Sequence, residues 1–362
     1  MNELTTAISK TWQQGYGPIR HNDETIERVA ALAASGLLDP DALYHILIAA
    51  DRLTSAAMWT VAHMTYAHRV DLSGEPLPAE AFKPTPEGHT GGSLNMVPAF
   101  VGYLAANAIT AKTRSWLMGQ GHSVAAIEAV NALTGDVSPA QRGRYDRSEK
   151  GLSQLAADFY SYAIDAHGAA AVPLGSHAGP NTAGAISEGG YLGFAEVQYV
   201  HAPLPGESLV AFLSDGAFEE QRGSDWTPRW WRAEDSGLAI PVMILNGRRI
   251  EERAQIAQQG GADWLADHLR LNGFDPFLID GHDPAAFACA IIEAEKRLER
   301  FAADPARTYP ASIPYVIAES VKGFGFPGAD TNAAHNLPLG GNPALDELAR
   351  NAFNEAAQAL FV

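Results

Sequence analysis

The sequence predicts an α/β fold with a doubly wound, mainly parallel sheet flanked by helices. Short apolar runs typical of buried strands alternate along the chain with longer segments of helical character. Glycine-containing turns follow several of these runs, as expected where parallel strands deliver their loops to one edge of a sheet. The expected strands are 115–118, 209–213, 242–245, 276–280 and 313–319.

The N-terminal residues 1–70 contain only helical patterns, so we expect a helical extension packed on one α/β domain formed by residues 71–362. Aspartate and threonine residues mark the expected helix starts, because their side chains can cap a helix N-terminus. In the extension we expect helices from Asp23 or Thr25 to Leu37, from Asp39 or Asp41 to Ala50, and over 53–67. In the domain we expect helices over 97–109, 124–133, 152–164, 263–271, 283–301 and 343–360.

Composition narrows the possible partners and location. The formal net charge of −17 argues against nucleic acid and anionic membrane as partners. No apolar run is long enough to span a bilayer, and the polar start lacks the pattern of a signal peptide. The single cysteine, Cys289, excludes an intrachain disulfide and fits a reducing environment. We therefore expect a cytoplasmic protein.

Asp215 and Asn246 each follow a buried-strand pattern, and a plausible crossover helix separates them. In an open α/β sheet, ligands bind beyond the carboxyl ends of the strands. Carboxylate and amide oxygens placed there suit Mg²⁺, a hard cation that often carries phosphates. Both residues also precede glycine, and such dipeptides are ordinary turn formers, so the residues alone leave the two interpretations about equal.

Four of the twelve histidines lie in glycine- or proline-punctuated loops. Histidine can move protons near neutral pH and can hydrogen-bond hydroxyl and phosphate groups. Zinc binding is the alternative, but no two of the four share a short metal-ligand spacing. Lys322, in a turn after the last expected strand, is positioned to meet a phosphate or to be solvated surface. The four histidines are His89, His122, His177 and His335.

Taken together, these motifs resemble those of a known family. Asp215-Gly216, about thirty further residues and Asn246 look like the thiamine-diphosphate motif of the transketolase superfamily. Other segments are similar to phosphoketolase segments more narrowly, and the ordered set is specific although each piece alone is weak. These segments are Lys83-Pro84, Gly88-His89, Gly119–His122, Gly175-Ser176-His177, Glu188–Gly193, Lys322-Gly323 and His335–Leu339.

The resemblance implies the fold of a thiamine-diphosphate-binding diphosphate domain and a role for each matching residue. Asp215, Asn246 and the backbone carbonyl of Arg248 would bind Mg²⁺, which holds the cofactor's diphosphate. The residues implied to contact the cofactor are Gly189, Gly190, Asp215, Gly216, Asn246, Lys322 and His335. The residues implied to line the substrate channel and to shuttle protons are His89, His122, His177 and His335.

The implied reaction is cleavage of a ketose phosphate such as xylulose 5-phosphate or fructose 6-phosphate. A phosphoketolase would use inorganic phosphate to release acetyl phosphate and an aldose phosphate, whereas a transketolase would pass the two-carbon unit to an aldose. The chain departs from the phosphoketolase pattern at Thr90, Tyr191, Ala217 and Asn336, which stand where tryptophan, glutamate, glutamate and glutamine are usual. A ketose-phosphate epimerase, specifically one acting on xylulose 5-phosphate, is therefore an alternative.

Family members place the cofactor between a diphosphate-binding and a pyrimidine-binding domain, and the second supplies an activating glutamate. This chain resembles the first domain only. We therefore expect it to act in a homo- or hetero-oligomer with a pyrimidine-binding domain or subunit. A non-catalytic assembly or regulatory subunit is the alternative of another class, and a metal hydrolase is a weaker third.

Overall fold

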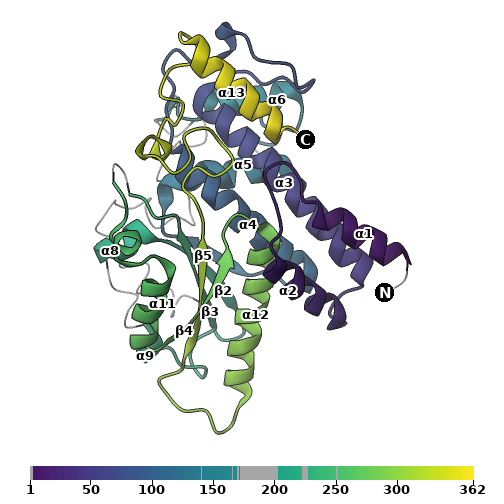
Figure 1. The fold of residues 1–362 in the computed structure, drawn as a ribbon, viewed down its shortest axis with the longest axis vertical. Coiled ribbons are helices and arrows are strands. Elements are labelled where there is room, and N and C mark those ends of the chain that lie inside the picture. The colour runs from purple at the N-terminus through teal and green to yellow at the C-terminus, as the bar shows by residue number, and fades with distance from the viewer. Residues whose placement is uncertain are drawn as a thin grey trace.

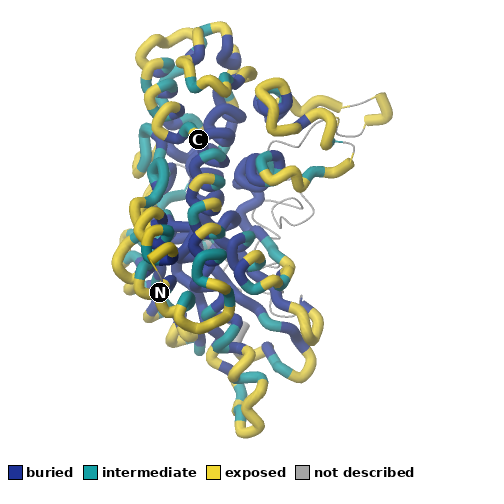
Figure 2. Tube along the Cα trace, turned by 90° about the vertical axis from the view of Figure 1, so that its right-hand side faces the viewer, coloured by how far each residue is buried: buried dark blue, intermediate teal, exposed yellow. Residues whose placement is uncertain are grey.

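The computed structural model describes residues 3–139, 141–164, 166–168, 171, 203–221, 227–249 and 252–362. Within these ranges, buried apolar side chains form one hydrophobic core that extends from the N-terminal helices through the sheet to the last helix. In Figure 2, the buried residues lie mainly in the interior of the molecule and the exposed residues at its periphery. None of the described helices combines the length and the apolarity needed to cross a bilayer.

A five-stranded parallel sheet forms the centre of the fold, with strand order β1-β2-β3-β5-β4. Helices flank the sheet, and α11 and α12 lie on opposite sides of it (Figure 1). The predicted α/β fold with a parallel sheet is therefore confirmed. The strands are β1 (Ser115–Met118), β2 (Ser208–Ser214), β3 (Leu238–Leu245), β4 (Phe274–Asp280) and β5 (Ile313–Glu319).

Strand β3 begins four residues earlier than expected, because Pro241 interrupts the apolar run in the sequence. Pro241 lies opposite Ala211 of β2, whereas β5 pairs with β3 only from Val242 onward. The proline therefore lies outside the ladder with β5, where a missing N–H group costs least.

The N-terminal segment forms α1 (Glu3–Gln13), α2 (Asp23–Ala34) and α3 (Pro40–Tyr66). The prediction of a break after Ala50 was wrong, since α3 is continuous. Asp51 is not a cap or turn residue there, because it is buried and hydrogen-bonds His21 from another segment. Asn22 caps α2 by accepting a hydrogen bond from the backbone N–H of Thr25, and Asp39 caps α3.

Helix α4 (Thr90–Thr110) begins seven residues before the expected start at residue 97, because the glycine-containing stretch 90–95 is helical and not a turn. The glycines of its first turn are enclosed by neighbouring segments, and this packing outweighs their low helix propensity. Helices α5 (Val124–Thr134) and α6 (Glu149–Asp158) follow. The latter ends earlier than expected because Tyr160 has a φ of 63°, which a right-handed helix excludes.

Short helices α8 (Asp215–Gln221) and α9 (Thr227–Trp230) lie between β2 and β3, and α10 (Gln255–Gln259) and α11 (Ala262–Leu271) lie between β3 and β4. Helix α12 (Pro284–Ala303) carries the expected aspartate cap, because Asp283 accepts a hydrogen bond from the N–H of Ala285. The chain closes with α13 (Glu347–Leu360), which Asp346 caps. Three-residue or four-residue 3₁₀ turns are η1 (Ala79–Ala81), η2 (Gly121–Ser123) and η6 (Asn332–His335).

Candidate functional site

Asp215 connects the carboxyl ends of β2 and β3. It is the first residue after β2 and is only 1% exposed. One carboxylate oxygen, Oδ2, accepts a hydrogen bond from the N–H of Gly247 at 2.7 Å, and Oδ1 accepts one from Gly216 at 2.9 Å. The carboxyl ends of β2 and β3 are thus joined by a hydrogen bond.

The turn after β3 presents further oxygen atoms at the same edge. Asn246 Oδ1 accepts a hydrogen bond from the N–H of Arg248 at 3.1 Å, and Gly247 has the positive φ of 76° that this turn requires. The carbonyl oxygens of Arg248 and Arg249 accept hydrogen bonds from Lys322 Nζ at 3.1 and 3.2 Å. A carboxylate, an amide oxygen and backbone carbonyls therefore meet beyond β2 and β3.

Lys322 brings a buried positive charge to this edge from the turn after β5. It is 3% exposed, and its ammonium also donates to His335 Nδ1 at 2.9 Å. Burial lowers the pKa of Lys322 to about 8, although the charge of Asp215 opposes the shift. Burial likewise raises the pKa of Asp215 to about 6, against the N–H of Gly247 and the charge of Lys322. A further opposite charge nearby would stabilise the charged form of either group, a cation for Asp215 and an anion for Lys322.

Three of the four predicted histidines gather in one cluster, which we call the histidine cluster: His89, His122 and His335. Their ring centroids are 5.4 Å apart for His89–His122, 5.4 Å for His89–His335 and 5.6 Å for His122–His335. These residues come from the N-cap of α4, from η2 after β1 and from η6 after β5. Segments far apart in the sequence thus converge on the edge that carries Asp215.

His335 is held neutral, because burial lowers its pKa to about 3, assisted by the charge of Lys322 and by His89. Its Nδ1 must be an acceptor, since the Lys322 ammonium can only donate. The remaining proton of the neutral ring therefore belongs on Nε2. His335 is a hydrogen-bond donor at Nε2.

Gly91 and Gly92 allow these segments to approach helix α4. A Cβ at Gly91 would lie 2.2 Å from the carbonyl oxygen of Ala334 and 3.0 Å from Lys322 Cγ. A Cβ at Gly92 would lie 2.9 Å from both His122 Nε2 and Ser123 Oγ. These glycines therefore bring Lys322, the η6 turn and His122 against one helix end.

Asn95 was not predicted as a site residue, although the structure gives it a clear role. It is 1% exposed on α4, and its Nδ2 donates to the carbonyl of Val321 at 2.8 Å. Its Oδ1 accepts from the N–H of Gly323 at 3.3 Å. Asn95 thereby fixes the turn that carries Lys322 to the helix that carries His89. The available signal was a polar residue in an almost wholly apolar segment.

The remaining predicted site residues lie outside the described part of the chain: His177, Gly189 and Gly190, with the Gly-Ser-His and Glu-Gly-Gly segments that contain them. Gly216 is described, and its α-carbon faces the aliphatic part of Arg249, since an added Cβ would lie 3.7 Å from Arg249 Cγ. The Arg248 side chain pairs with Asp330 and Asn332.

A second buried polar cluster, also not predicted, joins the N-terminal segment to the domain. His21 bonds Asp283 through Nδ1 at 2.8 Å and Asp51 through Nε2 at 3.1 Å, with its ring stacked on Trp12. Burial alone would lower the pKa of His21, but the two carboxylates outweigh it and raise the pKa to about 9. Both ring nitrogens bond carboxylates, so His21, Asp51 and Asp283 form a buried ion-pair triad.

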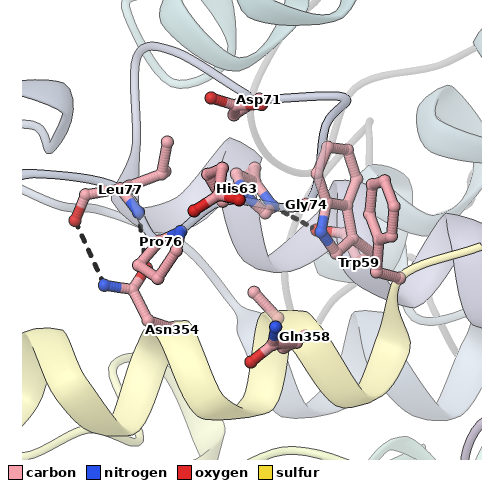
Figure 3. Close-up of a pocket in the computed structure, with 11 residues that line it drawn as sticks. Trp59, His63, Asp71, Gly74, Pro76, Leu77, Asn354 and Gln358 are labelled. Atoms are coloured by element: carbon pink, nitrogen blue, oxygen red, sulfur yellow. Dashed lines mark hydrogen bonds between the residues drawn. The ribbon is translucent and has the colours of Figure 1, made fainter.

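A small cavity lies apart from these groups, between α3, α13 and the segment around Asp71 (Figure 3). Its volume is about 20 Å³, which is room for one water molecule. His63, on its wall, donates from Nδ1 to the carbonyl of Trp59 at 2.8 Å, and burial lowers its pKa to about 4. None of the residues that line this cavity belongs to the histidine cluster or the Asp215 edge.

Curated relatives of the chain carry the name probable phosphoketolase. The protein from Brucella melitensis is 28% identical over 269 residues, which cover 71% of this chain and 31% of the relative. The protein from Thermosynechococcus vestitus is 26% identical and covers 80% of this chain and 37% of the relative. The protein from Streptomyces coelicolor is 28% identical, and the match covers 78% of this chain and 37% of the relative. The chain thus spans about a third of the length of these relatives.

Among solved structures, a transketolase mutant from Pichia stipitis matches 85% of this chain and 44% of its own, with 16% identity and a TM-score of 0.45. Transketolase from Leishmania mexicana matches with 14% identity and a TM-score of 0.42. The sequence model of the XFP N-terminal domain matches residues 44–333, which is most of the chain. The chain therefore belongs to the family of the XFP, or phosphoketolase, N-terminal domain.

Proposed function

We propose that this chain is the diphosphate-binding part of a thiamine-diphosphate-dependent enzyme that cleaves ketose phosphates. The observation that carries the proposal is the hydrogen bond between Asp215 Oδ2 and the N–H of Gly247. That bond joins the two halves of the expected diphosphate motif at the edge where Lys322 and the histidine cluster also lie. Membership of the phosphoketolase N-terminal domain family supports it.

Asp215, Asn246 and the backbone carbonyl of Arg248 are the residues proposed to hold Mg²⁺. They offer the carboxylate, amide and carbonyl oxygens that this ion prefers. Two features of the structure fit a cation here. Burial raises the pKa of Asp215 to about 6, which a nearby positive charge would reverse, and the Arg248 carbonyl already attracts the Lys322 ammonium. Gly189, Gly190, Gly216, Lys322 and His335 are proposed to contact the diphosphate.

When bound, thiamine diphosphate would supply the carbanion chemistry that breaks the carbon–carbon bond of the ketose. The residues of this chain would bind, orient and exchange protons. His335 is neutral with its proton on Nε2, so it is suited to donate to a substrate oxygen. His89 and His122, with rings within 6 Å of His335, and His177 are proposed to share the proton transfers.

The substrate we propose is xylulose 5-phosphate or fructose 6-phosphate, with inorganic phosphate as the acceptor and acetyl phosphate plus an aldose phosphate as products. The curated relatives named probable phosphoketolase favour this reaction over transfer to an aldose. The active form is proposed to be an oligomer that includes a pyrimidine-binding domain.

A ketose-phosphate epimerase is the second candidate, because two departures from the phosphoketolase pattern meet beside the histidine cluster. Thr90 Oγ1 donates to the backbone carbonyl of Asn336 at 2.6 Å. These residues follow His89 and His335 directly, so they lie where a change of side chain would alter the space available to a substrate.

The test is a product assay with the purified chain and a pyrimidine-binding domain. Xylulose 5-phosphate, thiamine diphosphate and Mg²⁺ are supplied with inorganic phosphate, with ribose 5-phosphate or with neither. We expect acetyl phosphate only when phosphate is present, and no turnover when the thiamine cofactor or the added domain is left out. Epimerisation of the ketose phosphate without cleavage would support the second candidate. Failure to convert any ketose phosphate would contradict the proposed activity and favour a non-catalytic subunit.

A further inference from the structure

The segment after α6, residues 159–162, is joined by three hydrogen bonds to the segment that leads into helix α4, residues 83–89. The carbonyl of Phe159 accepts a hydrogen bond from Lys83 Nζ at 2.9 Å. The hydroxyl of Tyr162 donates to Glu87 Oε1 at 2.7 Å. The hydroxyl of Tyr160 accepts a hydrogen bond from the backbone N–H of His89 at 3.2 Å.

Residues 159–162 include two residues with an uncommon backbone conformation. Tyr160 and Tyr162 have φ angles of 63° and 52°, in the left-handed region that bulky residues rarely adopt. Such conformations persist only where surrounding contacts over-determine them, and they concentrate at functional sites. Here the contacts are the tyrosine hydroxyls, both directed at residues beside Gly88.

Tyr160 completes the fixation of the His89 backbone. The carbonyl of His89 accepts hydrogen bonds from the N–H of Ser93 at 3.2 Å and from Ser93 Oγ at 2.9 Å, and Tyr160 takes its N–H. The Tyr160 ring also closes on Gly88, where an added Cβ would lie 3.2 Å from Tyr160 Cε2. The His89 ring packs against His122 and His335, with centroids 5.4 Å away in both cases, and the backbone that Tyr160 helps to fix determines where this side chain enters the cluster.

Burial keeps the Tyr160 hydroxyl protonated, because it raises the phenol's pKa well above its ordinary value. A neutral phenol oxygen can accept the His89 N–H while its own proton stays in place. The contact therefore persists over the whole neutral pH range.

We propose that Tyr160 is a positioning residue that sets the direction of the His89 ring within the histidine cluster. The significance of that ring for catalysis rests on the proposed function, but the positioning itself does not. Tyr162 holds Glu87, on the other side of Gly88, and is the matched contact that does not touch His89.

The test compares Tyr160→Phe with Tyr162→Phe in the 362-residue chain. Each substitution removes one hydroxyl and keeps the ring. The readout is the NMR spectrum of ¹³C-labelled histidine rings, with the His89 signal assigned by its loss in His89→Gln. We expect Tyr160→Phe to shift the His89 signal and its titration, while the signal of buried His63 stays unchanged. Tyr162→Phe should leave the His89 signal in place.

In the enzyme assembled with its pyrimidine-binding domain, Tyr160→Phe should lower kcat about tenfold with little change in KM, since small misplacements of a catalytic group are costly. An unchanged His89 signal in Tyr160→Phe, or equal shifts in both variants, would overturn the proposal. If Tyr160→Phe fails to fold, Gly88→Ala carries the test: its methyl group would meet Thr65 Oγ1 at 2.8 Å and Tyr160 Cε2 at 3.2 Å. The double variant Gly88→Ala/Thr65→Ala, which leaves only the contact with the Tyr160 ring, should still shift the His89 signal. Absence of thiamine-dependent turnover in every protein, with the predicted NMR shift present, would count against the proposed function alone.

Discussion

Lys322 contacts more than one part of the candidate site. Its ammonium donates hydrogen bonds to the carbonyls of Arg248, a proposed metal ligand, and of Arg249, and to the ring of His335. One side chain therefore links the turn after β3 to the histidine cluster. The pKa values follow from this link and from burial. Lys322 titrates near pH 8, and His335 stays neutral with a pKa of about 3. The protonation state of His335 therefore depends in part on the buried charge of Lys322.

Lys322→Met should raise the pKa of His335, because it removes a neighbouring positive charge. The value should remain below the ordinary 6.5, since burial is the larger cause of the depression and stays in place. Histidine NMR titration measures this directly. Lys10→Met, which changes an exposed lysine on α1, is the control and should leave His335 unaffected. A His335 pKa that stays at about 3 in Lys322→Met would contradict this account.

The His21 triad should make stability depend on pH above neutrality. His21 has a pKa of about 9 in the folded chain against an ordinary value of 6.5. The folded state thus binds the proton more tightly, and the stabilisation is fully present below pH 6.5 and lost as the pH rises through 9. The loss should be no more than about 3 kcal/mol in the free energy of unfolding.

Urea denaturation at several pH values between 6 and 9.5 tests this expectation. His21→Gln should abolish the decline in this window. His45→Gln, at an exposed position on α3, should retain it. Equal pH profiles for His21→Gln and the unsubstituted chain would show that the triad is not the source. Asp51, whose pKa burial raises to about 6, contributes in the same direction but in a more acidic window.

At the scale of single elements, helix α4 organises the site. His89 is its N-cap residue. Gly91 packs closely against Ala334 and Lys322, and Gly92 packs closely against His122. One turn later, Asn95 holds the turn around Lys322. The helix is therefore the common surface on which the loops after β1 and β5 are placed.

Gly91→Ala should destabilise the chain, although alanine is the better helix former. The added methyl group would meet the Ala334 carbonyl at 2.2 Å, and such overpacking costs about 1–3 kcal/mol, which exceeds the gain of about 1 kcal/mol in helix propensity. Gly143→Ala is the matched control, because no atom lies within 4 Å of its added Cβ. Urea denaturation should show a lower midpoint for Gly91→Ala alone, and an unchanged midpoint would refute the close approach.

The elements were predictable from sequence where the pattern was local. All five strands and the parallel sheet followed from apolar runs separated by helical segments, and Asp283 was recognised as a helix cap. The start of α4 was missed because glycines normally signal a turn, and here tertiary packing outweighs that preference. The continuity of α3 was missed for a similar reason, since Asp51 is polar but bonds His21 thirty residues earlier.

The candidate site was partly predictable on the same terms. Asp215, Asn246 and the histidines could be named because each follows a strand or opens a helix. Asn95, Tyr160 and the His21 triad could not, because their roles depend on contacts between segments distant in sequence. The roles proposed for Asp215, Asn246 and the histidines remain predictions.

At the scale of the whole molecule, the loops after β1, β2, β3 and β5 meet at one edge of the sheet, which we propose as a ligand platform. Strands β2, β3 and β5 are neighbours in the sheet (Figure 1), and the turns after them and the loop after β1 all contribute residues there. The chain spans about a third of the length of its curated relatives. Our proposal is that this edge binds the cofactor's diphosphate and that turnover needs an added pyrimidine-binding domain.

The most direct test of this account is calorimetric titration of the 362-residue chain with thiamine diphosphate in the presence of Mg²⁺. We predict Mg²⁺-dependent binding, weakened at least about 100-fold in Asp215→Ala, because the substitution removes the one charged ligand of the metal. Asp280→Ala, which removes a carboxylate at the end of β4 instead, should bind as the unsubstituted chain does. Binding by Asp215→Ala within about twofold of the unsubstituted chain, which corresponds to less than about 0.5 kcal/mol, would contradict the central claim.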